Sequence, residues 1–298
     1  MSEEGRRTRT YHEVPGGTAS DIAGQLDAMR ERLEARLANV GHVLAVMSGK
    51  GGVGKSLLTA NLAAALADDG LAVGVADADL NGPSMARLLG AERRPLEATD
   101  AGVRPATGAA GVRVMSMDLL LESDEAPVRW TGARSESWIW RATVEANALR
   151  EFLADTDWGA LDHLILDLPP GADRMLPIRD LVPGLAGVVA VTVPSRISRF
   201  VVAKSLTMAR ELELPVLGYV LNMAGYVCRD CGEVGPLFGG DAEGFEGTDR
   251  LGTIPFDPEF GRETDAGRPG VLACPDSAAA RAVREIAAAV RGRLEGGA

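Results

Sequence analysis

The stretch Gly49-Lys50-Gly51-Gly52-Val53-Gly54-Lys55-Ser56 decides the fold class of this chain. An apolar run at 43–47, typical of a buried strand, lies just before it, and a helical run at 57–67 follows it. A strand, a glycine-rich loop that ends in Lys-Ser, and a helix form a P-loop, in which backbone N–H groups and the helix N-terminus bind phosphate. We therefore predict that Lys55 contacts the β- and γ-phosphates of a nucleotide and that the Ser56 hydroxyl binds magnesium.

Further apolar runs alternate with helical patterns along the rest of the chain, at 72–76, 112–117, 164–166, 188–193 and 216–221. This alternation predicts an α/β protein in which helices cover both faces of a mostly parallel central sheet. Together with the phosphate-binding loop, it predicts the three-layer fold of P-loop NTPases. We expect one such domain over residues 43–298, with an insertion at about 225–252, where many glycines and two cysteines interrupt the pattern. Ligands of such sheets bind beyond the carboxyl ends of the strands, so the loops after these runs are expected to form the site.

Residues 1–42 are expected to hold a loose tail followed by an amphipathic helix. Between Ser20 and Val40 the apolar side chains recur at the spacing of one helical face, at Ile22, Leu26, Met29, Leu33, Leu37 and Val40. Periodicity alone leaves open whether this helix packs against its own sheet or contacts a partner.

Acidic residues follow two of the predicted strands. Asp167 ends the run at 164–166, where we expect it to hold magnesium through water, with a capping role as the alternative. Asp77 and Asp79 follow the run at 72–76. One of the two is expected to orient the attacking water, and we assign that role to Asp79, although both could cap the next helix.

The composition is that of a folded globular protein, with 46% hydrophobic and 24% charged residues among 298. Lys and Arg total 31 against 42 Asp and Glu, and the resulting charge of −11 repels phosphate backbones and anionic membrane surfaces. We therefore expect neither a nucleic acid nor a membrane as partner. The charged N-terminus and the shortness of the apolar runs predict a cytoplasmic protein.

Two of the three cysteines form the motif Cys228-x-x-Cys231 in the expected insertion. Two thiolates at this spacing supply half of a zinc site or half of an iron–sulfur site, because both sites normally need four ligands. A symmetric dimer would bring two such pairs together at its axis. The spacing does not choose between zinc and iron–sulfur, and a redox pair is a further alternative. Cys274 stands alone, and a buried thiol is its default interpretation.

Together, these motifs resemble the Mrp/ApbC family of iron–sulfur cluster carrier ATPases, part of the MinD/ParA-like class of P-loop NTPases with a deviant Walker A motif. Lys50, early in the loop, is the residue that indicates this class. The matching segments extend from about Gly41 to Leu294 and comprise Gly49 to Ser56, Asp77-Ala-Asp79, Gly82-Pro83-Ser84, Trp158-Gly159, Asp167-Leu-Pro-Pro-Gly171, Asn222-Met223, Cys228-x-x-Cys231, Ile254-Pro255 and Asp265-Ala-Gly-Arg-Pro269.

The resemblance implies an ATP hydrolase that works as a homodimer, with Lys50, Lys55 and Asp79 as catalytic residues. Lys50 would reach the nucleotide of the partner subunit, with a solvated loop charge as the alternative interpretation. Asn222 would lie against the adenine, with a buried side chain that satisfies backbone groups as the alternative. Two copies of the cysteine pair would hold a bridging 4Fe-4S cluster, with zinc possible in its place, and would pass the cluster to apo iron–sulfur proteins. The nucleotide site would comprise Gly49, Lys50, Gly51, Gly52, Val53, Gly54, Lys55, Ser56, Leu57 and Asn222, with Ser56 and Asp167 on magnesium and Cys228 and Cys231 on the cluster.

Three departures from the family pattern predict slow or differently gated hydrolysis. Leu57 stands where relatives usually have a second hydroxyl residue, Ala172-Asp173-Arg174 replaces the usual Thr-Gly-Asp, and Thr131-Gly132-Ala133 stands where Arg-Gly-Pro is common.

The alternative function is that of a MinD/ParA-type positioning ATPase, a switch that acts on membrane or DNA. Its support is the last predicted helix, from about Asp276 to Leu294, in which an apolar face opposes several arginines. The apolar face consists of Val283, Ile286, Val290 and Leu294, and the arginines are Arg281, Arg284, Arg291 and Arg293. The net charge of the chain weakens this alternative.

Overall fold

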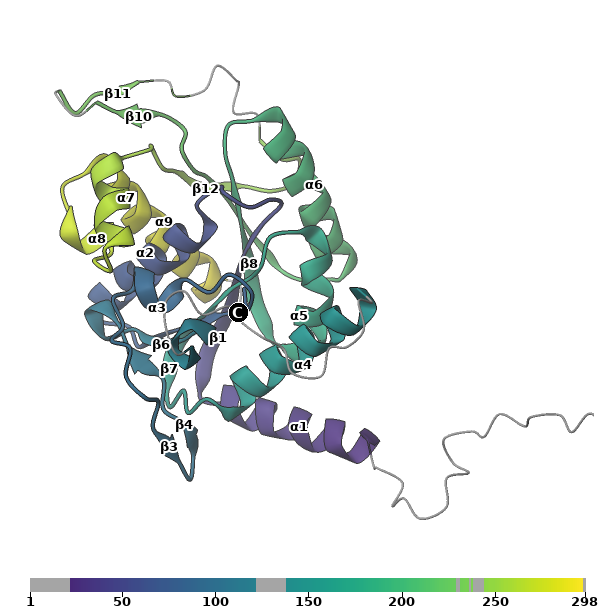
Figure 1. Cartoon of the computed structure of the whole chain (residues 1–298). Coiled ribbons are helices and arrows are strands. Elements are labelled where there is room, and N and C mark those ends of the chain that lie inside the picture. The colour runs from purple at the N-terminus through teal and green to yellow at the C-terminus, as the bar shows by residue number, and fades with distance from the viewer. Residues whose placement is uncertain (1–21, 122–137, 229–230, 236, 238–243, 297–298) are drawn as a thin grey trace, which may run out of the picture.

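The computed structural model describes residues 22–121, 138–228, 231–235, 237 and 244–296, without the side chains of 22–26 and 138–144. A central sheet runs through the molecule, with helices on both of its faces (Figure 1). The sheet has eight strands in the order β12-β9-β8-β1-β7-β2-β6-β5. All neighbours pair in parallel except β5, which runs antiparallel to β6 at one end. The predicted three-layer fold with a mostly parallel sheet is confirmed.

The six apolar runs of the sequence correspond to six sheet strands. Helices cover both faces of the sheet, so side chains on both sides of these strands are buried. Such strands are therefore apolar throughout and do not alternate with polar residues. The sheet strands are β1 (Val40–Ser48), β2 (Val73–Asp77), β5 (Ala106–Thr107), β6 (Arg113–Met115), β7 (Leu161–Asp167), β8 (Leu185–Thr192), β9 (Val216–Leu221) and β12 (Arg250–Thr253). Two small hairpins, β3 (Ala98–Thr99) with β4 (Gly102–Val103) and β10 (Tyr226–Val227) with β11 (Val234–Gly235), lie outside this sheet.

The helices divide into two layers, each with its own buried apolar cluster. One layer contains α2 (Lys55–Asp68), α3 (Met85–Leu88), α7 (Pro258–Asp265), α8 (Gly270–Ala273) and α9 (Ala278–Glu295). The other contains α1 (Ile22–Leu37), α4 (Trp138–Asp155), α5 (Met175–Leu181) and α6 (Arg196–Glu211). In Figure 1 the first layer lies to the left of the sheet and α4, α5 and α6 lie to its right.

The apolar face of α9 belongs to the core. Val283, Ile286, Val290 and Leu294 are all buried in the cluster that α9 shares with α2. Two arginines of the opposite face pair with carboxylates of the same domain, Arg284 with Asp68 and Arg293 with Asp249, each at 2.9 Å. This helix therefore has no apolar face available for a membrane surface. In the part of the chain that the structure describes, no helix has the length and hydrophobicity needed to cross a bilayer.

The N-terminal helix packs against its own domain. Leu33 of α1 is buried in the same cluster as Phe152 and Leu153 of α4, and Arg36 Nε donates a hydrogen bond of 3.1 Å to the Ala154 carbonyl. Of the two interpretations that the periodicity left open, these contacts favour packing within the chain. Residues 1–21, which include the expected tail, lie outside the described residues.

Candidate nucleotide and cluster site

The glycine-rich loop connects the end of β1 to the start of α2, at the carboxyl edge of the sheet. Gly54 precedes the first residue of α2 with φ +81°, in the left-handed region that favours glycine. A Cβ atom at Gly49 would lie 2.8 Å from the backbone of Val201 and Val202 in α6, so only glycine fits there. The loop is thus shaped by its glycines and packed against α6, as the sequence predicts for a phosphate-binding loop.

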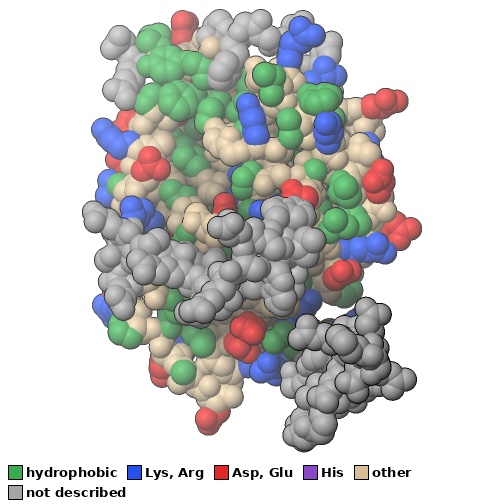
Figure 2. Space-filling view, turned by 45° about the vertical axis from the view of Figure 1, so that its right-hand side comes forward, with side chains coloured by type: hydrophobic (Ala, Val, Ile, Leu, Met, Phe, Trp, Pro, Cys, Tyr) green, Lys and Arg blue, Asp and Glu red, His purple; other side chains and the backbone are tan. Residues whose placement is uncertain are grey.

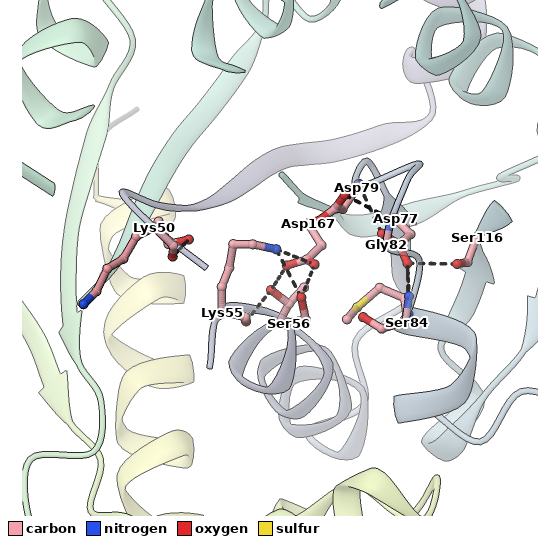
Figure 3. Close-up of polar contacts among 12 residues, drawn as sticks. Lys50, Lys55, Ser56, Asp77, Asp79, Gly82, Ser84, Ser116 and Asp167 are labelled. Carbon is pink, nitrogen blue, oxygen red and sulfur yellow. Dashed lines mark hydrogen bonds and ion pairs between the residues drawn. The ribbon is translucent and has the colours of Figure 1, made fainter. Parts of the chain in front are cut away.

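Lys55, Ser56 and Thr59 converge on the carboxylate of Asp167. Figure 3 shows Lys55 and Ser56 beside Asp167. Lys55 Nζ lies 2.6 Å from Asp167 Oδ2, and Ser56 Oγ donates a hydrogen bond of 2.6 Å to the same oxygen. Thr59 Oγ1 donates to Asp167 Oδ1, also at 2.6 Å. The Lys55 side chain is only 7% exposed and that of Asp167 is fully buried, so water screens this ion pair weakly.

These residues fit a magnesium ion bound beside a nucleotide. The Ser56 hydroxyl and the Asp167 carboxylate are hard oxygen donors of the kind that magnesium prefers, and they lie next to each other, as expected. Thr59 was not predicted from the sequence. Its position, three residues after Ser56 and four after Lys55, places all three on the same side of α2, which could have indicated it.

The two acidic residues after β2 have different surroundings. The Asp77 carboxylate is buried and accepts hydrogen bonds from the backbone N–H groups of Ser84 and Met85, at 2.7 and 2.9 Å, and from the Ser116 hydroxyl at 2.9 Å. Burial, together with the charge of nearby Asp167, raises the pKa of Asp77 to about 7. Asp77 therefore anchors the start of α3 and is not exposed to attacking water.

Asp79 is partly exposed at the same edge of the sheet (Figure 3). Its Oδ1 accepts a long hydrogen bond of 3.3 Å from the Gly82 N–H. Of the two carboxylates, Asp79 is the better placed to contact water, which agrees with the role assigned to it. That role stays a prediction.

Lys50 extends away from Lys55, Ser56 and Asp167 (Figure 3). Its carbonyl accepts a hydrogen bond of 3.0 Å from Ser48 Oγ, which fixes the backbone of the loop at this point. A side chain that leaves its own phosphate site in this way is compatible with the expected contact across a dimer interface.

Asn222, at the end of β9, holds the phosphate loop. Its Nδ2 donates a hydrogen bond of 2.8 Å to the Val53 carbonyl, and the side chain is buried. A Cβ atom at Gly54 would lie 2.3 Å from this nitrogen, so Asn222 could not keep this position beside a larger residue at 54. The expected contact of Asn222 with adenine stays a prediction.

The cysteine pair lies at the turn of the β10–β11 hairpin. Cys228 directly follows β10 and is half-buried, whereas Cys231 is exposed. The Cys228 N–H donates to the Glu233 carbonyl at 2.8 Å, and its carbonyl accepts from the Gly232 N–H, also at 2.8 Å. Among the described residues, no group of three or more histidines, cysteines and acidic residues could hold a metal ion. The described residues thus provide two thiols here, which is half of the four-ligand site that the sequence predicts.

The expected insertion at 225–252 contains this hairpin, and its last residues already belong to the edge strand β12, which begins at Arg250. Cys274 lies at the end of α8, is half-buried, and does not complete a ligand group in the described part of the chain. Burial and the nearby carboxylate of Glu259 raise the pKa of its thiol.

The family model that describes the NUBPL iron-transfer P-loop NTPases of the ParA group matches residues 39–291. The chain belongs to this family of iron-transfer P-loop NTPases. The match covers both the phosphate loop and the cysteine pair, and it confirms the membership expected from the motifs.

Relatives with a related name cover nearly the whole chain. The iron-sulfur cluster carrier protein of Saccharolobus solfataricus is 40% identical, over 88% of this chain and 87% of its own length. The protein of the same name from Methanocaldococcus jannaschii is 37% identical, over 94% of both chains.

Solved structures agree on the fold. A nucleotide-binding protein from Archaeoglobus fulgidus, solved in complex with ADP, is 35% identical and superposes with a TM-score of 0.66 over 81% of this chain and 92% of its own. The cell division ATPase MinD of Pyrococcus furiosus has a TM-score of 0.60 at 22% identity, over 85% of this chain and 99% of its own, and so supports the fold alone.

Two of the three departures from the family pattern have defined places, and the third, Thr131-Gly132-Ala133, lies outside the described residues. Leu57 is partly buried and packs against the core cluster under α2. Ala172-Asp173-Arg174 forms a 3₁₀ helix between β7 and α5, and Arg174 makes an ion pair of 2.7 Å with Glu145 of α4.

Proposed function

We propose that this protein is an ATP-dependent carrier of iron–sulfur clusters, which binds and hydrolyses ATP, holds a 4Fe-4S cluster between two subunits, and passes it to apo iron–sulfur proteins. The observation that carries the proposal is the position of Asn222. Its side chain holds the phosphate loop at Val53, and its backbone leads within six residues to Cys228. A change of nucleotide state at the loop is thereby linked by a short piece of chain to the cysteine pair.

The nucleotide half of the proposal rests on the groups around Asp167. Lys55 would turn from Asp167 to the β- and γ-phosphates when ATP binds, because the phosphates carry more negative charge than one carboxylate. Ser56 and Asp167 would hold magnesium, which when bound neutralises charge on the phosphate oxygens. Asp79 would orient the attacking water, and Lys50 of the partner subunit would approach the same phosphates.

The cluster half rests on the hairpin that carries Cys228 and Cys231. A 4Fe-4S cluster takes four thiolates, so two hairpins related by a two-fold axis would complete the ligand set. The exposure of Cys231 leaves its sulfur accessible to a second hairpin and, during transfer, to the acceptor's own thiols. Zinc at the same four thiolates is the alternative metal.

A surface beside the phosphate loop is suited to contact another chain. Ile197 and Phe200 of α6 are 70% and 62% exposed, and Lys204 Nζ lies 4.5 Å from the centre of the Phe200 ring. Figure 2, which turns the α6 side forward, shows hydrophobic side chains interspersed with Lys and Arg side chains in its upper part. Exposed apolar residues gathered in this way are typical of protein interfaces. The same helix packs against Gly49, so an interface here would adjoin the nucleotide.

Cluster transfer tests the proposed function. The protein, loaded with iron and sulfide without oxygen, is mixed with an apo 4Fe-4S enzyme, and recovery of that enzyme's activity is followed with and without ATP. We expect recovery with the wild-type carrier and none with Cys231→Ala, which lacks one thiolate per subunit. Equal recovery with both carriers would show that the iron and sulfide reach the acceptor without the hairpin and would contradict the proposal.

A further inference from the structure

A carboxylate on α4 connects the two loops that leave the candidate nucleotide site. Glu145 Oε1 accepts a hydrogen bond of 2.8 Å from Asn81 Nδ2, and Glu145 Oε2 accepts one of 2.7 Å from Arg174 Nη1. Asn81 lies two residues after Asp79, in the β2–α3 loop. Arg174 lies in the loop that follows Asp167 at the end of β7. The two loops therefore meet at the side chain of Glu145, and α4, which carries it, contains neither Asp79 nor Asp167.

The bridge lies beside a pocket. A cavity of about 220 Å³ lies between α4, α5 and the β2–α3 loop, and its walls include Leu80, Leu149, Pro177 and Ile178. Close packing normally fixes the relative position of neighbouring segments. Where a cavity takes the place of packed side chains, the polar contacts of Glu145 have to fix the separation of the loops.

The surroundings of Glu145 strengthen its ion pair with Arg174. Its side chain is only 13% exposed and that of Arg174 is 33% exposed, whereas the surface ion pair of Glu97 with Arg104 is more than 60% exposed on both sides. An ion pair that is shielded from water holds its geometry better than an exposed pair, which solvent and salt screen. Arg174 also belongs to the segment in which this chain departs from the family pattern.

We propose that Glu145 is a positioning residue, which holds the loops of Asp79 and Asp167 at a fixed separation around the phosphates of ATP. The inference rests on the proposed ATP hydrolysis. Glu145 does not touch the nucleotide in this account. It acts through Asn81 and Arg174, so its loss should slow the chemical step more than it weakens ATP binding.

Steady-state hydrolysis and ATP affinity, measured separately, test this role. We expect Glu145→Ala to lower kcat about tenfold or more, because misplaced catalytic groups lose rate steeply, and to change the Kd of ATP less than about threefold. Asn81→Ala removes the other end of one of the two hydrogen bonds of Glu145, and it should also lower kcat. Because Asn81 is exposed, this variant tests the bridge even if Glu145→Ala disturbs folding. The control is Glu97→Ala, which removes the exposed pair with Arg104 and should leave kcat unchanged.

A charge swap distinguishes the bridge from a merely structural role. In the double variant Glu145→Arg/Arg174→Glu the ion pair is restored in reverse, and the Asn81 carboxamide can accept a hydrogen bond as well as donate one. We expect kcat to recover to within about threefold of wild type. Wild-type kcat in both Glu145→Ala and Asn81→Ala would overturn the inference. Absence of ATP turnover in the wild-type protein would instead contradict the proposed function, and the iron content of the same samples would show whether cluster binding survives.

Discussion

Replacing Lys55 by alanine is expected to lower the affinity for ATP at least about 100-fold, which corresponds to about 2.7 kcal/mol. The ammonium group of Lys55 lies at the start of α2 beside Ser56, where the phosphates of a nucleotide would lie, and charge-assisted hydrogen bonds are the strongest polar contacts available to them. Titration with a fluorescent ATP analogue measures the affinity. Unchanged affinity would contradict the assignment of the phosphate site.

The same substitution has a second effect on stability, because Asp167 is fully buried and loses its cation. Breaking a buried pair costs about 3–5 kcal/mol, so the variant should unfold at lower urea concentration than wild type. The double variant Lys55→Ala/Asp167→Asn removes the unpaired charge. We expect it to regain much of the stability while ATP affinity stays low, which separates the loss of binding from the loss of folding.

Replacing Cys228 by alanine is expected to remove at least about nine-tenths of the bound iron and sulfide, because each subunit would keep a single thiolate of the four that a cluster needs. ATP affinity should stay within about twofold of wild type, because none of the residues expected to bind the nucleotide lies in the hairpin. Iron and acid-labile sulfide are determined after anaerobic reconstitution, beside an ATP titration of the same sample.

Cys274→Ala is the matched control for this experiment. It removes one thiol at the end of α8 and should leave both the iron content and the ATP affinity unchanged. Iron retained in Cys228→Ala, or lost in Cys274→Ala, would show that the cluster ligands were assigned wrongly.

Much of the fold could be predicted from the sequence because buried parallel strands appear as continuous apolar runs. All six expected runs became sheet strands. The edge strands β5 and β12 were missed as strands, since they are short and carry no such run, and Arg250 of β12 was assigned to the insertion. The role of α9 could not be predicted either: its periodicity fits a core helix and a membrane-surface helix equally well, and only the burial of residues such as Val283 and Ile286 decides.

Site residues could be predicted where they belong to a motif or stand at the end of a predicted strand. Ser56 and Asp167, far apart in sequence, lie next to each other because the loop before Ser56 follows β1 and Asp167 ends β7, and these parallel neighbours end at the same edge of the sheet. A bond from Asn222 to buried backbone was one of two open interpretations, but its partner Val53 and the bridge through Glu145 could not be predicted, because each depends on the order of strands and on helix placement. No local pattern around Glu145 marks it as a partner of Asn81 and Arg174.

The central claim is that two copies of the chain share one four-iron cluster. Its most direct test is the content of iron, sulfide and zinc per chain in the anaerobically reconstituted wild-type protein, determined on the same sample as its mass in solution. We expect a dimer with about two irons and two sulfides per chain and little zinc. A monomer that holds no iron, or a dimer that holds about half a zinc per chain in place of iron, would contradict it.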